Sequence, residues 1–182
     1  SEAEAAPSPS PAPTPSPTPR STPTPEPEPT AYTFTISAAG DCTLGTDFQF
    51  GTYMSFHEAY AEHGPAWFLE KVQDVFANDD LTVVNLEGPL TAGGETRPKS
   101  NPEGKIEYHF RGDPEFAQVL SLGSVEAVTL ANNHAKDYLQ PGYDDTIAAL
   151  EAENISWFDG DTPLIYEKPV RLSVKMTIPS GT

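Results

Sequence analysis

The sequence has little sulfur and little positive charge. Its 182 residues include a single cysteine, Cys42, so no disulfide can form within the chain. Ten Lys and Arg residues stand against 27 Asp and Glu residues, which gives a formal net charge of −17, and no basic run occurs. Such a surface repels the phosphates of nucleic acids and the headgroups of anionic lipids. The composition therefore argues against nucleic-acid binding and against electrostatic adhesion to a membrane.

Long hydrophobic runs are also missing, and we expect no direct insertion into a membrane. The chain opens with the polar residues Ser1-Glu2-Ala3-Glu4 rather than with a leader, as a mature secreted chain would. We therefore expect an extracellular, cell-surface or envelope-associated protein. Cys42 follows Asp41 at the end of an apolar stretch, and we interpret it as a small half-buried filler rather than a nucleophile.

Residues 1–30 contain no aromatic and no branched aliphatic side chain. Eleven of the 20 prolines lie between Pro7 and Pro29, where they alternate with Ser, Thr, Ala and Glu. This composition predicts a disordered Pro/Thr/Ser-rich linker, either a semi-rigid polyproline II spacer or a passive tail. Residues 31–182 hold every Phe, Tyr and Trp and are long enough for one core.

Strand and helix patterns alternate through residues 31–182, which predicts an α/β fold with a largely parallel sheet. Apolar stretches predict strands at residues 34–41, 81–87, 125–131 and from 155 onward, with a shorter strand at 106–110. Helical spacing predicts helices at 65–76, 113–123 and 142–153. Proline at the first position of the first two helices supports their starts, and Asn154 can end the third in a left-handed conformation.

Polar side chains follow three of these strands directly. They are Asp41, Glu87 and the run Asn132-Asn133-His134. The carboxyl ends of parallel strands meet at one edge of a sheet, where ligands collect. Carboxylate, amide and imidazole groups together suit a divalent metal. Asp137 lies close enough in sequence to orient the imidazole of His134.

Each of these residues also has a plain structural interpretation. A Gly-Asp pair such as Gly40-Asp41 is more often a turn than a metal ligand, and Glu87 could be an exposed carboxylate that enters a loop. The Asn132-Asn133-His134 run favours function, because two amides and an imidazole are costly to bury without partners.

Several motifs together resemble the CapA family, the bacterial capsule-synthesis proteins associated with poly-γ-glutamate. The resemblance covers roughly residues 33–168 and rests on Gly40-Asp41, residues 85–91, 110–114 and 130–138, Gly142 and residues 146–150. This family is itself similar to calcineurin-type metallophosphoesterases. The resemblance implies that the chain is the N-terminal half of a metallophosphoesterase-type α/β sandwich, truncated at its C-terminal side. Leu139 stands where the family usually has glycine.

The resemblance also implies roles for individual residues. Asp41, Glu87 and Asn133 would bind a divalent metal, which could be Mn²⁺, Zn²⁺ or Mg²⁺. His134, with Asp137, would be catalytic and would stabilise the transition state or protonate the leaving group. Asn132 and Arg111 would bind substrate. The later histidines that complete the metal site of the family are missing here, so we expect weak metal binding.

Two classes of function remain open at this point. One is a metal-dependent hydrolase or transferase that acts on poly-γ-glutamate or another envelope polymer. The other is a non-catalytic surface component that helps to assemble or export an anionic polymer, together with other capsule-synthesis membrane proteins. The strong negative charge of the chain is unfavourable for holding a polyanion unless bound cations bridge the two.

Overall fold

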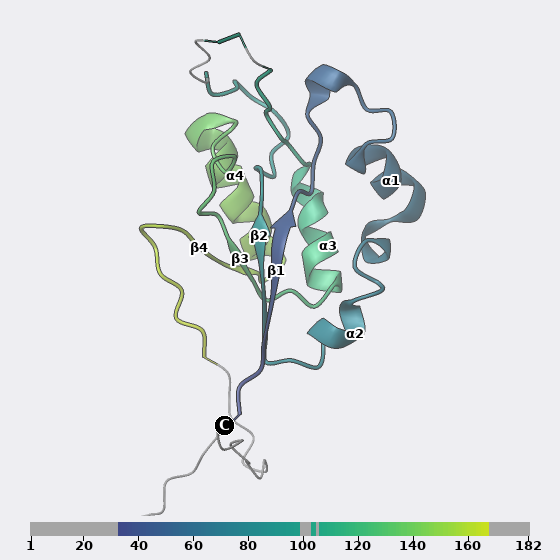
Figure 1. Cartoon of the computed structure of the whole chain (residues 1–182), viewed down its shortest axis with the longest axis vertical. Helices are drawn as coiled ribbons and strands as arrows, with labels where there is room; N and C mark the ends of the chain where they lie inside the picture. Colours follow the sequence, from purple (N-terminus) through teal and green to yellow (C-terminus); the bar gives the residue numbers. More distant parts are fainter. Residues whose placement is uncertain (1–32, 99–102, 105, 168–182) are drawn as a thin grey trace, which may run out of the picture. The chain divides into compact units, whose positions relative to one another are not determined.

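Four parallel strands form the sheet of this protein, for which a computed structural model describes residues 33–98, 103–104 and 106–167 (Figure 1). The strands pair in the order β1-β2-β3-β4. Their bounds are Ile36–Cys42 for β1, Leu81–Leu86 for β2, Ala127–Thr129 for β3 and Ser156–Phe158 for β4. The α/β fold expected from the sequence is confirmed. The linker predicted at residues 1–30 lies outside the described residues.

Short helices connect each strand to the next. The β1–β2 connection carries the 3₁₀ turn η1 (Phe48–Phe50), α1 (Phe56–His63), η2 (Pro65–Trp67) and α2 (Gln73–Phe76). The other two connections carry η3 (Pro114–Phe116) with α3 (Ala117–Leu122), and α4 (Leu139–Ala152). Crossovers between parallel strands are right-handed. When strand order equals chain order, that handedness puts every connecting helix on the same face of the sheet.

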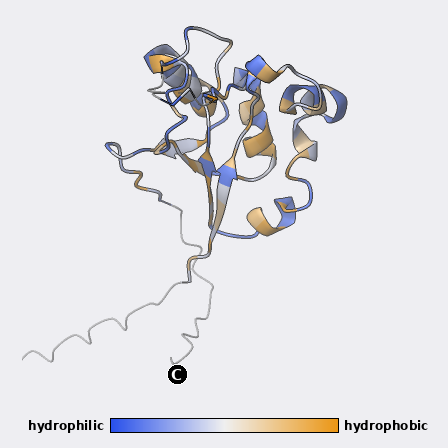
Figure 2. Ribbon diagram, turned by 45° about the horizontal axis from the view of Figure 1, so that its top comes forward, coloured by the Kyte–Doolittle hydropathy of each residue, from blue (hydrophilic) through white to orange (hydrophobic). Residues whose placement is uncertain are grey.

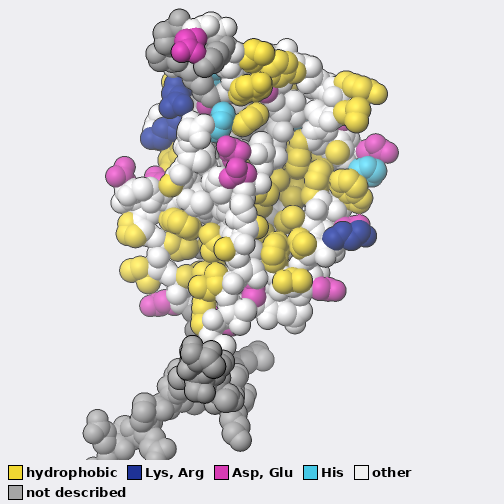
Figure 3. Space-filling model, viewed as in Figure 1, with side chains coloured by type: hydrophobic (Ala, Val, Ile, Leu, Met, Phe, Trp, Pro, Cys, Tyr) yellow, Lys and Arg dark blue, Asp and Glu magenta, His cyan; other side chains and the backbone are white. Residues whose placement is uncertain are grey.

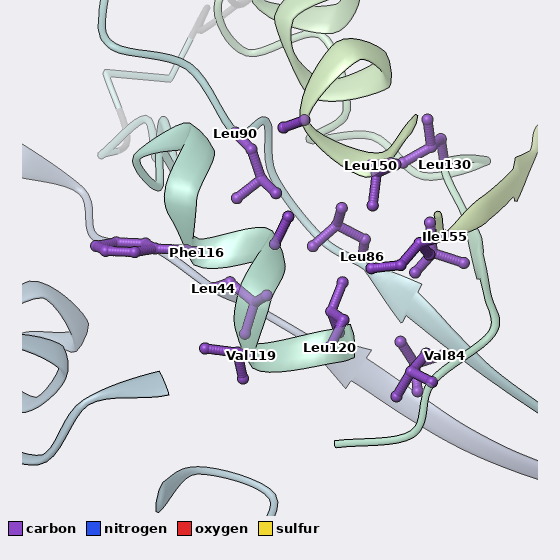
Figure 4. Packing of buried hydrophobic residues seen from close by; sticks show 14 of the residues in the cluster. Leu44, Val84, Leu86, Leu90, Phe116, Val119, Leu120, Leu130, Leu150 and Ile155 are labelled. Atoms are coloured by element: carbon purple, nitrogen blue, oxygen red, sulfur yellow. The ribbon is translucent and has the colours of Figure 1, made fainter. Parts of the chain in front are cut away.

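The hydrophobic core lies on this helix-covered face. Along β2 the side chains alternate, with Thr82, Val84 and Leu86 buried and their neighbours half-buried. Figure 4 shows Leu86 beside Leu120 of α3 and Leu150 of α4, and all three belong to one buried cluster. α3 is correspondingly rich in hydrophobic residues, whereas α1 is largely hydrophilic and has no fully buried residue (Figure 2).

On the opposite face of the sheet, the described residues bury the side chains only in part. Ile36 pairs with Leu81 and is 58% exposed, and Ala38 pairs with the half-buried Val83. One parallel sheet with helices on a single face is consistent with part of a metallophosphoesterase-like domain. No helix within the described ranges is long and apolar enough to cross a membrane.

Two expected elements differ in the structure, and one helix forms that the sequence did not predict. The helix predicted at residues 65–76 is divided into η2 and α2, and in the turn between them Phe68 stacks on Phe56, with ring centroids 4.3 Å apart. An unexpected helix, α1, forms within and just beyond the aromatic segment 48–60. Its start is capped by Ser55, whose Oγ accepts from the Glu58 N–H, while Glu58 Oε2 accepts from the N–H of Met54, one residue before the cap.

The strand predicted at residues 106–110 does not form. The His109 N–H donates to Asp47 Oδ2 at 2.9 Å, and the Phe110 N–H donates to Asp137 Oδ2 at 3.0 Å. Buried carboxylates thus take two of the backbone donors that a neighbouring strand would need. The segment runs past the sheet as an irregular chain.

Residues 111 and 112 fasten the loops that follow β1 and β2. Arg111 and Thr46 exchange two backbone hydrogen bonds, of 2.9 and 3.1 Å. The Gly112 N–H donates to Pro89 O, and the Thr91 N–H donates to Gly112 O. A Cβ atom at Gly112 would lie 1.9 Å from Leu44 O, so only glycine allows this close approach. The two loops are therefore held as one unit at the carboxyl end of the sheet.

Candidate functional site

A row of hydrogen-bonded side chains crosses the carboxyl ends of the first three strands. Asn85 Nδ2 donates to Asp41 Oδ1 at 2.7 Å, and Asn132 Nδ2 donates to Asn85 Oδ1 at 3.0 Å. Asp41 and Asn85 are partners in the β1–β2 register, and Asn132 lies three residues beyond Thr129, the β3 partner of Asn85. The structure therefore brings Asp41 and Asn132 to one edge with Asn85 between them, whereas the sequence predicted Asn133, and not Asn132, beside Asp41 as a metal ligand.

A β-bulge in β1 sets the direction of Asp41. Ala38 pairs with Val83, but Asp41 pairs with Asn85, so β1 has one extra residue between the two pairs. Without this bulge Asp41 would pair with Leu86 and face the core, because a shift of one residue moves a side chain to the other face. The bulge keeps the carboxylate of Asp41 exposed beside Asn85.

The side chain of Asn132 is fully engaged within the protein. Its Nδ2 also donates to Leu86 O at 2.9 Å, and its Oδ1 accepts a hydrogen bond from the His134 N–H at 3.0 Å. These contacts build the turn that presents the next two residues, Asn133 and His134. Asn132, predicted to bind substrate, thus shapes the turn through its own side chain.

His134 and Asp137 form a close pair. His134 Nδ1 lies 2.6 Å from Asp137 Oδ2, the side chain of Asp137 is fully buried, and that of His134 is 13% exposed. The Phe110 N–H donates to the same carboxylate oxygen, and the Phe110 ring packs against the imidazole with centroids 4.5 Å apart. A carboxylate oxygen only accepts hydrogen bonds, so the pair favours the tautomer with its proton on Nδ1. Asp137 has the orienting geometry that the sequence predicts for it.

The remaining predicted site residues lie around this row. Glu87 is half-buried at the end of β2, where its Oε2 accepts from Thr43 Oγ1 at 3.2 Å. Asn133 is exposed, and its carbonyl oxygen accepts from Arg97 Nη2 at 2.9 Å.

Arg111 lies between the fastened loops, and its side chain is 16% exposed. Its Nη1 donates to Thr91 O at 3.0 Å and lies 3.5 Å from Asp113 Oδ1, while its guanidinium covers the Phe48 ring at 4.3 Å. Arg111 therefore contributes to loop structure, and its substrate-binding role stays a prediction.

The donors fit a divalent metal only in part. Within the ranges that the structure describes, no group of three or more His, Cys, Asp or Glu side chains lies close enough to hold an ion. The row offers one carboxylate followed by two amides that bond to each other. Asp41, Glu87 and Asn133 as placed do not make a closed coordination shell, so the metal site stays a prediction.

Cys42 does not act as a nucleophile beside the candidate site. Its side chain packs against the core cluster, and burial raises the pKa of its thiol to about 11. The thiol is therefore protonated near neutral pH and is a poor nucleophile. This agrees with its interpretation as a small filler.

A cleft of about 610 Å³ opens beside the row, at the ends of β3 and β4. Four charged side chains line it, together with Asn132, Asn133 and apolar neighbours; they are Arg97, Lys136, Asp159 and Asp161. Sequence reasoning missed all four, because they come from three separate loops. Asp159 accepts from Tyr143 Oη at 2.7 Å, and this bond, with backbone N–H donors, lowers the pKa of Asp159 to about 2.

Comparison with known proteins identifies the family. The family model described as bacterial capsule synthesis protein PGA_cap matches residues 35–160. The chain belongs to this family. It is also 26% identical over 109 residues to the PGA biosynthesis protein CapA of Bacillus subtilis (strain 168), a stretch that covers 60% of this chain. That stretch is 27% of the CapA protein, so the chain spans about a quarter of the length of this curated relative.

Family membership agrees with the resemblance drawn from the motifs and associates the chain with capsule synthesis. The matched range contains the whole row from Asp41 to Asp137 and nearly the whole lining of the cleft. It also contains the contacts that join the loop after β2 to α4. In these contacts the Leu90 N–H donates to Thr146 Oγ1 at 2.9 Å, and Thr91 Oγ1 donates to Asp145 Oδ2.

Proposed function

We propose that this chain contributes a metallophosphoesterase-like site to an envelope protein of capsule synthesis that acts on poly-γ-glutamate or a related anionic polymer. The observation that carries the proposal is the His134–Asp137 pair, with its nitrogen–oxygen distance of 2.6 Å and its buried carboxylate. A histidine held in one orientation at the end of a parallel strand is typical of a residue that transfers a proton.

The chemistry of the pair follows from its geometry. Asp137 accepts from Nδ1, and Nε2 of His134 is the ring nitrogen that we propose exchanges a proton with a ligand. Phe110 packs on the ring and keeps it from rotating. His134 is thus suited to protonate a leaving group or to stabilise a negatively charged oxygen.

Asp41, Glu87 and Asn133 are the proposed ligands for Mn²⁺, Zn²⁺ or Mg²⁺. Because the described residues supply too few donors in one place, we expect this chain to bind such ions weakly and to show no appreciable hydrolysis by itself.

The second candidate is a non-catalytic component that binds an anionic envelope polymer and assists its assembly or export. The incomplete set of metal donors among the described residues favours it. In either case the proposed location is extracellular, at the cell surface or in the envelope, with other capsule-synthesis membrane proteins as proposed partners.

Calorimetric titration with Mn²⁺ and Zn²⁺ tests the metal proposal. We expect weak binding by this chain and further loss in Asp41→Ala and in Asn133→Ala, while Asp74→Ala, an acidic residue on the surface of α2, should bind as the unchanged chain does. Tight binding would show that the donor set is complete, and equal binding by all variants would remove Asp41 and Asn133 from the site.

Hydrolysis is tested in a full-length family protein that contains this segment. His134→Asn should remove most of its phosphodiester or γ-glutamyl hydrolase activity, and Asp137→Asn should reduce it and change its dependence on pH. If His134→Asn left the activity unchanged, the catalytic proposal would be wrong, and the non-catalytic candidate would stand.

A further inference from the structure

Basic side chains are scarce on this protein, yet half of those described lie in one place. The described residues include four Lys and Arg side chains: Lys71, Arg97, Arg111 and Lys136. Two are engaged elsewhere, since Lys71 pairs with Glu70 at 2.7 Å and Arg111 with Asp113 at 3.5 Å. The other two, Arg97 and Lys136, line the 610 Å³ cleft.

The backbone of Arg97 is fixed, while its side chain keeps an unused donor. The Arg97 N–H donates to Asp137 O at 2.7 Å, and the Arg97 carbonyl oxygen lies 2.8 Å from His109 Nε2. Its Nη2 donates to Asn133 O, but its buried Nε has no hydrogen-bond partner. A buried donor without a partner is energetically costly, which favours a movement of the guanidinium that lets a ligand acceptor reach this Nε.

Two acidic side chains, Asp159 and Asp161, form the acidic wall of the cleft. Asp159 bonds to Tyr143 Oη and to the backbone N–H groups of Asp161 and Thr162, which hold its carboxylate in place. Asp161 is exposed beside it. These carboxylates would repel a pure polyanion. A ligand with an anionic and a cationic group close together would find a basic partner for the first group and an acidic partner for the second.

We infer that the cleft binds the amino-terminal residue of a γ-linked glutamate chain, with its carboxylate at Arg97 and Lys136 and its ammonium group at the acidic wall. This inference rests on the proposed function, which names the polymer. The cleft adds which part of the polymer is recognised, namely its amino-terminal end. In a γ-linked chain only the first residue carries a free ammonium and a free α-carboxylate on one carbon. The size of the cleft lies within the range usual for small-molecule sites, roughly 300–1,000 Å³.

Binding of a short γ-linked glutamate oligomer, with EDTA present to exclude metal bridging, tests this inference. Two probes are compared by calorimetry, one with a free amino terminus and one N-acetylated. We expect the acetylated oligomer to bind roughly tenfold more weakly, because it loses a charge-assisted hydrogen bond. Equal binding of the two probes, or no binding of either, would overturn the inference.

Substitutions in the lining of the cleft test whether the oligomers bind there. Arg97→Gln and Lys136→Gln should each weaken both probes roughly tenfold, and Asp161→Asn should weaken only the probe with a free amino terminus. Lys71→Gln is the matched control, because it removes the same charge from the exposed pair with Glu70. If Lys71→Gln weakened binding as much as Lys136→Gln does, the effect would be one of net charge and the cleft would not be the site.

One further variant separates this inference from the proposed metal chemistry. Asp41→Ala removes a proposed metal ligand that does not line the cleft. Oligomer binding in EDTA should survive in this variant even if metal binding is lost. Loss of oligomer binding there would contradict a separate recognition site.

Discussion

At the scale of single residues, Leu139 shows where the backbone is strained. Its φ is +58°, at the start of α4, in the left-handed region that costs a residue with a side chain roughly 1–2 kcal/mol. The family usually has glycine at this position. The strain lies just after the His134–Asp137 turn, where the chain reverses into the helix.

Leu139→Gly should therefore raise the free energy of unfolding by roughly 0.5–1 kcal/mol, which is the relief of strain less the entropy that glycine loses on folding. Chemical denaturation measures the change. Leu139→Ala is the control, since it shortens the side chain but keeps the strained φ, and it should bring no gain. A Gly variant less stable than the Ala variant would show that Leu139 is not strained.

His57 should make stability depend on pH. Burial lowers the pKa of its imidazole below 6.5, despite the opposing effect of Asp113, and the ring is packed between Phe48 and Phe116. The unfolded chain therefore takes up a proton near pH 6.5, before the folded protein does. The contribution of His57 to the free energy of unfolding should be complete above that pH and should decline as the pH falls below it.

Melting temperatures between pH 7.5 and about 5 test this expectation. His57→Gln should flatten the profile over this window, whereas His63→Gln, at the exposed end of α1, should keep the original slope. An unchanged slope in His57→Gln would mean that another group sets the pH dependence.

At the scale of elements, the two faces of the sheet differ in what they contribute to stability. Val83 and Val84 are neighbours in β2, but Val84 is 3% exposed and belongs to the core, while Val83 is half-buried on the opposite face. Val84→Ala should cost about 2 kcal/mol, from two lost methyl groups and the cavity they leave, and Val83→Ala should cost less than about 1 kcal/mol.

Equilibrium unfolding of the two variants measures this difference with the same substitution at adjacent positions. Equal losses would show that the second face is as well packed as the first and would contradict a one-sided core.

The same elements show what sequence patterns can and cannot predict. The apolar residues in Leu81–Leu86 and Ala127–Thr129 predict β2 and β3, because strands inside a sheet are rich in such residues. The segment at 106–110 alternates like a strand, but its backbone donors are taken by Asp47 and Asp137, which are distant in sequence. The start of α1 was readable in Ser55 and Glu58, whose spacing is that of a capping box.

At the scale of the whole molecule, the candidate site is predictable only where it lies on strands. Asp41, Asn132 and His134 follow apolar stretches, so a parallel sheet brings them to one edge. Asn85 was missed as a site residue, because its contact with Asp41 depends on a bulge that shifts the register by one residue. The charged lining of the cleft was missed because loops hold it, and loop positions follow from contacts that no local pattern records.

Charge also differs between the whole molecule and its parts. Figure 3 shows acidic side chains spread over the face in view and few basic ones. The net charge of −17 thus describes the surface as a whole, while Arg97 and Lys136 give the cleft a basic wall. The net charge argues against nucleic acid as a partner, but it does not exclude an anionic ligand at one small site.

The order of the strands has a consequence for how the chain is made. Each strand pairs with the strand that precedes it in the sequence, β2 with β1, β3 with β2 and β4 with β3. β2, β3 and β4 each emerge with a partner strand already synthesised, so every strand–helix–strand unit can close as soon as its second strand emerges. A sheet built in this order can form from its first strand to its last during synthesis, and the polar row at its edge would be assembled one strand at a time.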